Sequence, residues 1–332
     1  MKLLFKLSGI FLCVHLAACN DTAVHSPFQE ILVQPPYLSL TDSIRNNQNN
    51  DGLYFRRGLL LRKNGLIEPA LADFQQAWTL KSKEEYAAGI STILLERRPD
   101  SAIIFITDAL RRVPSSLFLQ LDLVRAYRGL HETEKALQLC DEIIKKEPRQ
   151  IDALMIRSDL LEEKQDTAGS LASLEKAYQL APFDLELNYD LAFKYAQSRN
   201  AKALVLCNSL LKLQAAHPPA EPYYLKGVYY SNINDKDRAI VFFDLAIQHD
   251  YNFLDAYLDK GRTLYEQKKI KEALKVFTLA SSISPAYADA YYWTGKCLQN
   301  LGQNNEAKEN YQRAYGFDKT LLEARDSANK IN

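Results

Sequence analysis

Hydrophobic and polar residues recur with a helical period along most of the chain, and from residue 51 onward the pattern itself repeats every 34 residues. Small and aromatic residues keep fixed places within this period. The clearest series are Gly227, Gly261 and Gly295, then Ala239, Ala273 and Ala307, then Phe243, Phe277 and Tyr311. A repeat of this length predicts one pair of antiparallel helices per period, and therefore an all-α fold.

The period and its occupants resemble the tetratricopeptide repeat (TPR). In that family small residues let the two helices of a unit approach closely, and larger residues fill the space between them. The resemblance implies a right-handed α-solenoid of about eight TPR helix-turn-helix units over residues 51–332. The expected units begin at residues 51, 83, 117, 151, 185, 220, 254 and 288. A short capping helix is expected over Leu322–Asn332, because the last unit of a stack needs a polar cover.

The N-terminal residues predict an export signal. Lys2 and Lys6 precede an apolar stretch, Leu7 to Ala18, which is too short to cross a bilayer that needs about 20 helical residues. The sequence Leu16-Ala17-Ala18-Cys19 resembles the lipobox of bacterial lipoproteins, which implies removal of residues 1–18 and lipidation of Cys19. The alternative is a plain secretory signal cut at a nearby alanine. The resemblance implies a lipid-anchored protein of the bacterial cell envelope, with the outer membrane favoured, facing the periplasm or the cell surface.

Two segments are expected to lie outside regular repeats. Residues 19–50 predict the lipidated cysteine and a flexible tether, because they contain three prolines and a run of Asn and Gln without an apolar period. A short helix around Leu38–Ile44 is the alternative for part of this tether. Residues 214–222, with the sequence QAAHPPAEP, predict an enlarged loop between units. This loop is either a hinge between five N-terminal and three C-terminal units or a rigid connection.

Composition and motifs indicate binding rather than catalysis. The chain has 41 basic and 41 acidic residues, so it lacks the net positive charge that holds nucleic acids. No nucleotide-binding loop, nucleophile elbow or zinc motif is present, and Asp235-Lys236-Asp237 lacks the glycine and glutamate of a calcium loop. Cys140, Cys207 and Cys297 occupy core positions and are expected to be buried. We therefore expect no catalytic residue, cofactor or metal.

The TPR resemblance places ligand contacts on the concave surface formed by the first helices of the units. The candidate groove residues are Arg125, Arg128, Asp159, Tyr189, Phe193, Tyr224, Asn232, Arg262, Tyr265, Tyr292, Lys296 and Asn300. This mixture of aromatic, amide and charged side chains suits a protein or peptide partner. The expected function is that of a membrane-anchored scaffold or adaptor in cell-envelope assembly or secretion. The alternatives are a pilotin-like lipoprotein, a peptidoglycan-hydrolase adaptor, and an enzyme or small-ligand sensor.

Overall fold

The computed structural model describes residues 28–331, and within that range the protein is built from helices without any strand. The predicted signal, the lipobox and Cys19 lie outside the described residues. Within the described range, none of the helices combines the length and the apolar character that crossing a bilayer requires.

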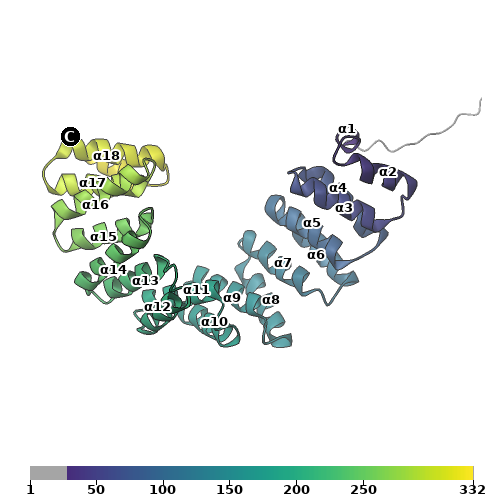
Figure 1. The fold of residues 1–332 in the computed structure, drawn as a ribbon, viewed down its shortest axis with the longest axis horizontal. Coiled ribbons are helices and arrows are strands. Elements are labelled where there is room, and N and C mark those ends of the chain that lie inside the picture. The colour runs from purple at the N-terminus through teal and green to yellow at the C-terminus, as the bar shows by residue number, and fades with distance from the viewer. Residues whose placement is uncertain (1–27, 332) are drawn as a thin grey trace, which may run out of the picture. The chain divides into compact units, whose positions relative to one another are not determined.

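Eight helical pairs follow one another along the chain (Figure 1). The first helices of the pairs are α3 (Asp51–Lys63), α5 (Glu84–Arg97), α7 (Leu117–Gly129), α9 (Ile151–Glu163), α11 (Leu185–Gln197), α13 (Glu221–Asn232), α15 (Leu254–Glu266) and α17 (Ala288–Asn300). The second helices are α4 (Ile67–Leu80), α6 (Pro99–Arg112), α8 (Thr133–Lys146), α10 (Thr167–Leu180), α12 (Lys202–Leu213), α14 (Lys236–His249), α16 (Ile270–Ile283) and α18 (Asn304–Phe317). The predicted all-α class and the eight units are confirmed, and each pair begins within one residue of its predicted start.

Close contact between the two helices of a unit explains the repeated small residues. Gly58, Gly227, Gly261 and Gly295 each lie against an aromatic ring of the second helix of the same unit. A Cβ atom at Gly261 would lie only 2.4 Å from the ring of Phe277, so a larger residue would force the helices apart. In the α9–α10 unit two buried serines take these places, and the hydroxyls of Ser158 and Ser170 lie 2.8 Å apart.

The turns inside the units share one backbone conformation that the sequence pattern did not indicate. A left-handed residue occurs in seven of these turns in the described chain, and only two of the seven are glycines. At Lys268 (φ 62°) the following amide, that of Lys269, donates to the carbonyl of Leu264 at 3.0 Å. This is the bond that closes a Schellman helix end. Backbone hydrogen bonds therefore define the turns, and no glycine is needed to mark them.

The chain divides into two compact units, residues 1–119 and residues 120–332, with the boundary inside α7. The core of the first contains Phe74, Tyr86, Ile90 and Ile106, all essentially inaccessible to solvent. The second contains the wide loop before α13. One hydrophobic cluster crosses this loop, because Leu191 and Tyr195 of α11 pack with Leu225 and Tyr229 of α13. The helices on the two sides of residues 214–222 therefore share one hydrophobic cluster.

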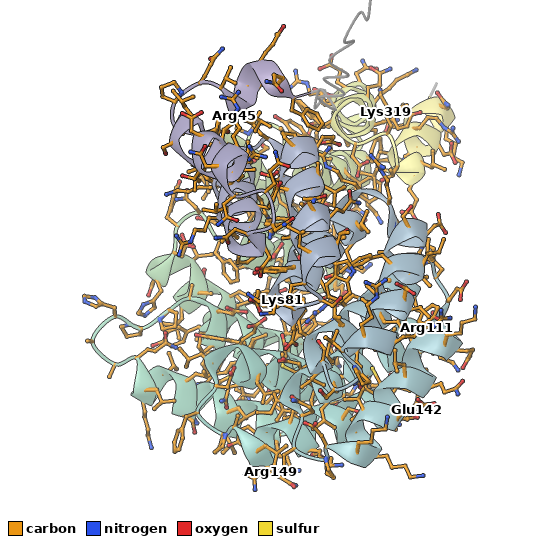
Figure 2. All side chains as sticks on the ribbon, turned by 90° about the vertical axis from the view of Figure 1, so that its right-hand side faces the viewer. Arg45, Lys81, Arg111, Glu142, Arg149 and Lys319 are labelled. Carbon is orange, nitrogen blue, oxygen red and sulfur yellow. The ribbon has the colours of Figure 1, made fainter. Side chains whose placement is uncertain are left out.

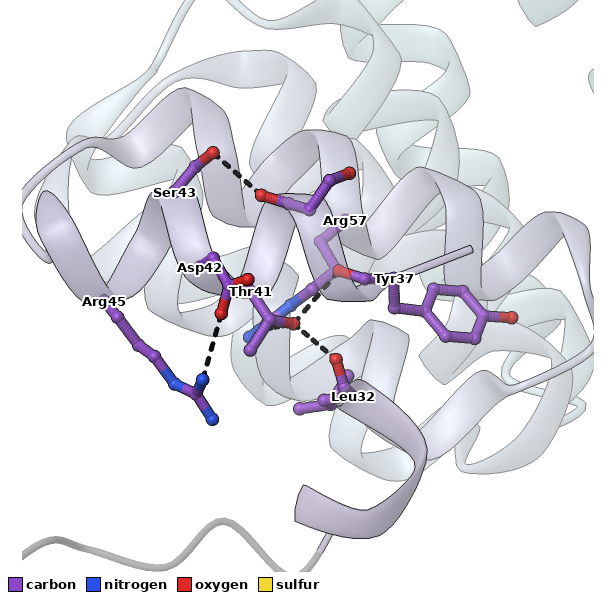
Figure 3. Close-up of polar contacts among 8 residues, drawn as sticks. Leu32, Tyr37, Thr41, Asp42, Ser43, Arg45 and Arg57 are labelled. Atoms are coloured by element: carbon purple, nitrogen blue, oxygen red, sulfur yellow. Dashed lines mark hydrogen bonds and ion pairs between the residues drawn. The ribbon is translucent and has the colours of Figure 1, made fainter. Parts of the chain in front are cut away.

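Part of the expected tether is folded onto the first repeat. Residues 28–46 contain α1 (Gln29–Leu32) and α2 (Leu38–Asn46), and α2 packs on α3. Arg57 of α3 binds Asp73 through two 2.7 Å hydrogen bonds and donates a third, at 3.0 Å, to the hydroxyl of Thr41 in α2. Thr41 in turn donates to the carbonyl of Leu32 at 2.6 Å (Figure 3). The tether prediction was wrong for this part, because a few buried contacts stabilise α2 without a long apolar period.

The C-terminal cap is present as predicted. α19 (Leu322–Lys330) packs on α18, and Ala324, Ala328 and Ile331 join a buried cluster with Tyr292 and Tyr311. Charged side chains along the second helices and the loops point away from the ribbon instead, as Arg111, Glu142 and Arg149 do in Figure 2. Exposed apolar side chains occur on both kinds of helix, for example Leu59 on α3 and Val205 on α12.

Candidate functional site

A cleft of about 710 Å³ is lined mainly by α11, α13 and α15, the first helices of three successive units. We call it the α13 cleft. Its lining residues are Phe193, Gln197, Arg199, Tyr224, Val228, Ser231, Asn232, Asn234, Phe243, Asp259, Arg262, Thr263 and Glu266. Four of the twelve candidate groove residues, namely Phe193, Tyr224, Asn232 and Arg262, thus lie around one cleft.

Tyr224 forms the aromatic wall of the α13 cleft. Its ring packs against Phe243 and Phe253, with centroids 5.9 and 5.0 Å away. Its hydroxyl donates a 2.9 Å hydrogen bond to Oδ2 of Asp259. Burial and the charge of Asp259 raise the pKa of Tyr224, so the phenol stays protonated and remains a donor. Burial also raises the pKa of Asp259, although the hydrogen bond from Tyr224 opposes that effect.

The cleft presents two exposed arginines. Arg199 sits in the turn after α11 with a left-handed backbone (φ 60°), and no ion pair is found for it within the described residues. The side chain of Arg262 is 50% exposed, lies 3.5 Å from Asp259, and has its guanidinium over the ring of Trp293 at 5.5 Å. The acidic Glu266 is already paired with Lys236 at 3.1 Å. The two arginines are therefore available to bind polar groups of a ligand.

Asn232 ties neighbouring units together at the edge of this cleft. Its side-chain amide donates to the carbonyl of Ala196 in α11 at 3.1 Å. The amide group is therefore partly used by the protein itself, and Asn232 positions α13 against α11 as well as lining the cleft.

A second cleft of about 290 Å³ lies between α9 and α11, and we call it the α11 cleft. It shares Phe193 with the α13 cleft. Its lining residues are Met155, Asp159, Glu162, Leu174, Glu186, Asp190, Phe193 and Lys194. Arg128 donates to Asp159 at 2.9 Å and to Glu163 at 2.7 Å, while Lys194 pairs with Glu162. The predicted residues Arg128 and Asp159 thus bind each other.

Of the remaining predicted residues, some side chains are exposed and others already bind neighbouring residues of the protein. Arg125 pairs with Asp122 at 2.9 Å, the hydroxyl of Tyr189 accepts a bond from Gln214 at 2.9 Å, and Asn300 is exposed. Lys296 lies over the ring of Trp293 at 4.5 Å and over that of Tyr265 at 6.0 Å. These residues flank the two clefts along the first helices but do not line either cleft.

Tyr292 was predicted to line the groove, but the structure places it in the core. It is 8% exposed and packs in the cluster that α19 covers. Its hydroxyl donates to Glu323 of α19 at 2.9 Å. Burial, then the hydrogen bond to Glu323, raise the pKa of Tyr292 to about 12. The residue at the same repeat position is half-buried in the preceding units, as at Tyr224 and Leu258, whereas the capping helix buries it in the last one.

The charged cleft residues missed from the sequence include Glu186, Asp190 and Arg199. A signal for Glu186 exists, because an acidic residue stands at the first or second place of each first helix from α9 onward, at Asp152, Glu186, Glu221, Asp255 and Asp289. Such residues also stabilise a helix N-terminus through its dipole, and this makes the signal ambiguous. Arg199 lies in a turn, outside the helix positions from which the groove was predicted.

The three cysteines of the repeats are buried and form no disulfide, as their core positions predicted. Burial raises the pKa of each thiol to about 12. A thiol with such a pKa is protonated at neutral pH and is a poor nucleophile.

Comparisons with known proteins identify the repeats. Models of the tetratricopeptide repeat match residues 121–184, 220–252 and 288–320, and a TPR repeat model matches residues 261–302. A search of the curated proteins found no match. Among solved structures, a tetratricopeptide repeat protein from Parabacteroides merdae ATCC 43184 is 14% identical. The alignment covers 85% of this chain and 98% of that chain with a TM-score of 0.52.

A second similar structure is the Cut9–Hcn1 hetero-tetramer of APC/C. The aligned chain is 14% identical, and the alignment covers 87% of this chain and 57% of that chain with a TM-score of 0.48. The family models and the first structure agree with the helical pairs described above. The family models cover α9 and α13 beside the two clefts, whereas α11, which lines both clefts, lies outside the matched residues.

Proposed function

We propose that this chain, which contains tetratricopeptide repeats, is a membrane-anchored interaction scaffold that binds a polypeptide segment of a partner protein along its first helices. TPR units are protein-interaction modules, and this general role follows from the repeats themselves. The observation that carries the more specific proposal is the α13 cleft, where one aromatic wall and two exposed arginines come together from three units.

The chemistry of the α13 cleft suits an extended peptide. Tyr224 and Val228 supply apolar contact, while Arg199, Arg262 and Asn234 supply hydrogen-bond donors. Extended segments present backbone carbonyls and alternating side chains, so apolar anchors and polar donors can both be satisfied. The three buried cysteines have protonated thiols, so the proposal gives them no nucleophilic role.

The anchoring part of the proposal rests on the residues before the repeats. Lipidation of Cys19 would hold the scaffold at a bacterial membrane, because two or three acyl chains bind a bilayer firmly. A role in envelope assembly or secretion belongs to this proposal, including the pilotin-like and hydrolase-adaptor alternatives.

The test uses a photoreactive amino acid at position 262 in the full-length chain, in its native host. Arg262 is preferred to Tyr224, because Tyr224 is tied to Asp259 and to the packing of α13. We expect one dominant crosslinked protein, and its purified form should bind the wild-type chain about tenfold more tightly than the Arg262→Ala variant.

The matched control is Arg313, an exposed arginine of α18 without an ion pair in the described residues. The probe at position 313 should not crosslink the same protein, and Arg313→Ala should leave its binding unchanged. Equal crosslinking from both positions, or equal affinity of both variants, would show that the α13 cleft is not the binding site.

A further inference from the structure

The α11 cleft carries more negative charge than its own basic residues balance. Four carboxylates line it, from Asp159, Glu162, Glu186 and Asp190, against a single ammonium group, that of Lys194. Lys194 is committed to Glu162, and Asp159 is bound by Arg128. Within the described chain, neither Glu186 nor Asp190 has an ion-pairing Lys or Arg. Two carboxylates therefore remain without an ion pair, although the nearby charge of Lys194 acts to lower the pKa of Asp190.

Both of these carboxylates, those of Glu186 and Asp190, line the α11 cleft. Glu186 and Asp190 are four residues apart on α11, so they lie on one face of that helix, one turn from each other. Loss of solvent, then the charges of Asp159 and Glu186, raise the pKa of Asp190. Loss of solvent and the charge of Asp190 also raise the pKa of Glu221 at the start of α13. Negative potential thus accumulates where α9, α11 and α13 approach one another.

Apolar side chains complete the cleft beside these carboxylates. Met155 of α9, Leu174 of α10 and Phe193 of α11 are partly or fully buried around it. A Lys or Arg side chain has a charged head and a long apolar stem, and it needs both kinds of surface when it binds. Within the described residues no group of His, Cys, Asp and Glu side chains is arranged to hold a metal ion. The cleft therefore suits an organic cation on a flexible stem.

We propose that the partner segment is basic, and that one of its Lys or Arg side chains enters the α11 cleft and pairs with Glu186 and Asp190. The stem of that side chain packs on Met155 and Phe193. Because Phe193 also lines the α13 cleft, the same segment continues from one cleft into the other. This inference rests on the proposed function and specifies the chemistry of the partner.

The experiment selects short random peptides on the immobilised mature chain and compares the wild-type protein with a Glu186→Gln, Asp190→Asn double variant. The substitutions keep the shape of both side chains and remove only their charges. The matched control is a Glu306→Gln, Glu309→Gln double variant on α18, where both carboxylates are exposed and have no ion pair in the described residues. Thermal unfolding of each variant confirms that it is folded.

We expect the wild-type chain and the control variant to enrich peptides that contain Lys or Arg. The selected peptides should bind the Glu186→Gln, Asp190→Asn variant about tenfold more weakly, and their affinity for the wild-type chain should fall as salt concentration rises. Enrichment of acidic or neutral peptides that lose affinity for the Arg262→Ala variant would overturn this inference and leave the proposed function standing. No enrichment on any variant would count against the proposed function itself.

Discussion

At the scale of single residues, the carboxylate of Asp51 links the first two repeats within the N-terminal compact unit. The carboxylate of Asp51 at the start of α3 lies 2.8 Å from the ammonium group of Lys83. It also accepts a 2.5 Å hydrogen bond from the hydroxyl of Tyr86 in α5. The bond from Lys83, and then that from Tyr86, lower the pKa of Asp51 from 3.8 to about 2. Both contacts therefore favour the ionised carboxylate in the folded state.

This pKa predicts a pH dependence of stability. The folded-state pKa is below the unfolded one, so the contribution of Asp51 is fully present above about pH 4 and is lost as the pH falls toward 2. Asp51→Asn should lower the free energy of unfolding by about 1 kcal/mol at neutral pH, since solvent screens part of the interaction. The difference from wild type should shrink between pH 4 and pH 2 in urea unfolding. A constant difference, or an equal effect of the exposed control Asp100→Asn, would contradict the assignment.

Some residue roles could be read from the sequence, and others depended on neighbours that the sequence does not place. The glycine contacts inside the units follow directly from the 34-residue period, because Gly227, Gly261 and Gly295 recur at that spacing. The exposure of Tyr292 depends on whether another helix covers it, and only the structure shows α19 in that place. The uncompensated charge of Glu186 and Asp190 likewise depends on how Lys194 and Arg128 are already used.

At the scale of elements, the 34-residue period predicted the eight helical pairs but gave no indication of α1 and α2. The helices of a repeat can be predicted because the same residue types occur again 34 positions later. The α1–α2 segment has no such copy, and a few buried side chains, among them Leu32, Tyr37 and Ile44, stabilise it. A hydrogen bond from Arg57 to Thr41 links this segment to α3, and Thr41 lies 16 residues before Arg57. The same spacing of 16 separates Asp141 from Arg157 and Asp244 from Lys260, each pair bridging a second helix and the next first helix.

The repeated spacing indicates that α2 takes the place of the second helix of a preceding unit. Arg57→Ala should therefore both destabilise the first repeat and release α2. The side chains of Arg57 and Asp73 are only 8% and 7% exposed, so removing the arginine leaves a buried carboxylate without its partner, at a cost of about 3–5 kcal/mol. Amide hydrogen exchange should show α2 losing protection before the helices of the C-terminal compact unit.

The control for this prediction is the neighbouring Arg56→Ala. Arg56 is exposed and no contact of its side chain is found in the described residues, so this substitution should change stability by less than about 0.5 kcal/mol. Equal effects of the two substitutions would mean that the buried pair and the Thr41 bond do not stabilise the packing of α2 on α3.

At the scale of the whole molecule, the anchoring proposal depends on one thiol. Cys19→Ser removes the acceptor of the lipid, so the variant should move from the membrane fraction to the soluble fraction after cell lysis. The matched control is Cys13→Ser, which changes a cysteine inside the apolar stretch of the expected signal. The control should stay with the membrane. Continued sedimentation of the Cys19→Ser variant with membranes would place any anchor elsewhere.

The folding of α1 and α2 onto the first repeat changes how far an anchored molecule can extend. With a lipid on Cys19, only ten peptide units separate the attachment point from Gln29, the first residue of α1. A chain of that length spans at most about 35 Å, whereas the 31 residues of the expected tether could span about 100 Å. The first repeat would then stay near the headgroups. Partners in the immediate vicinity of the bilayer would come within its range, and those farther into the surrounding compartment would have to approach it.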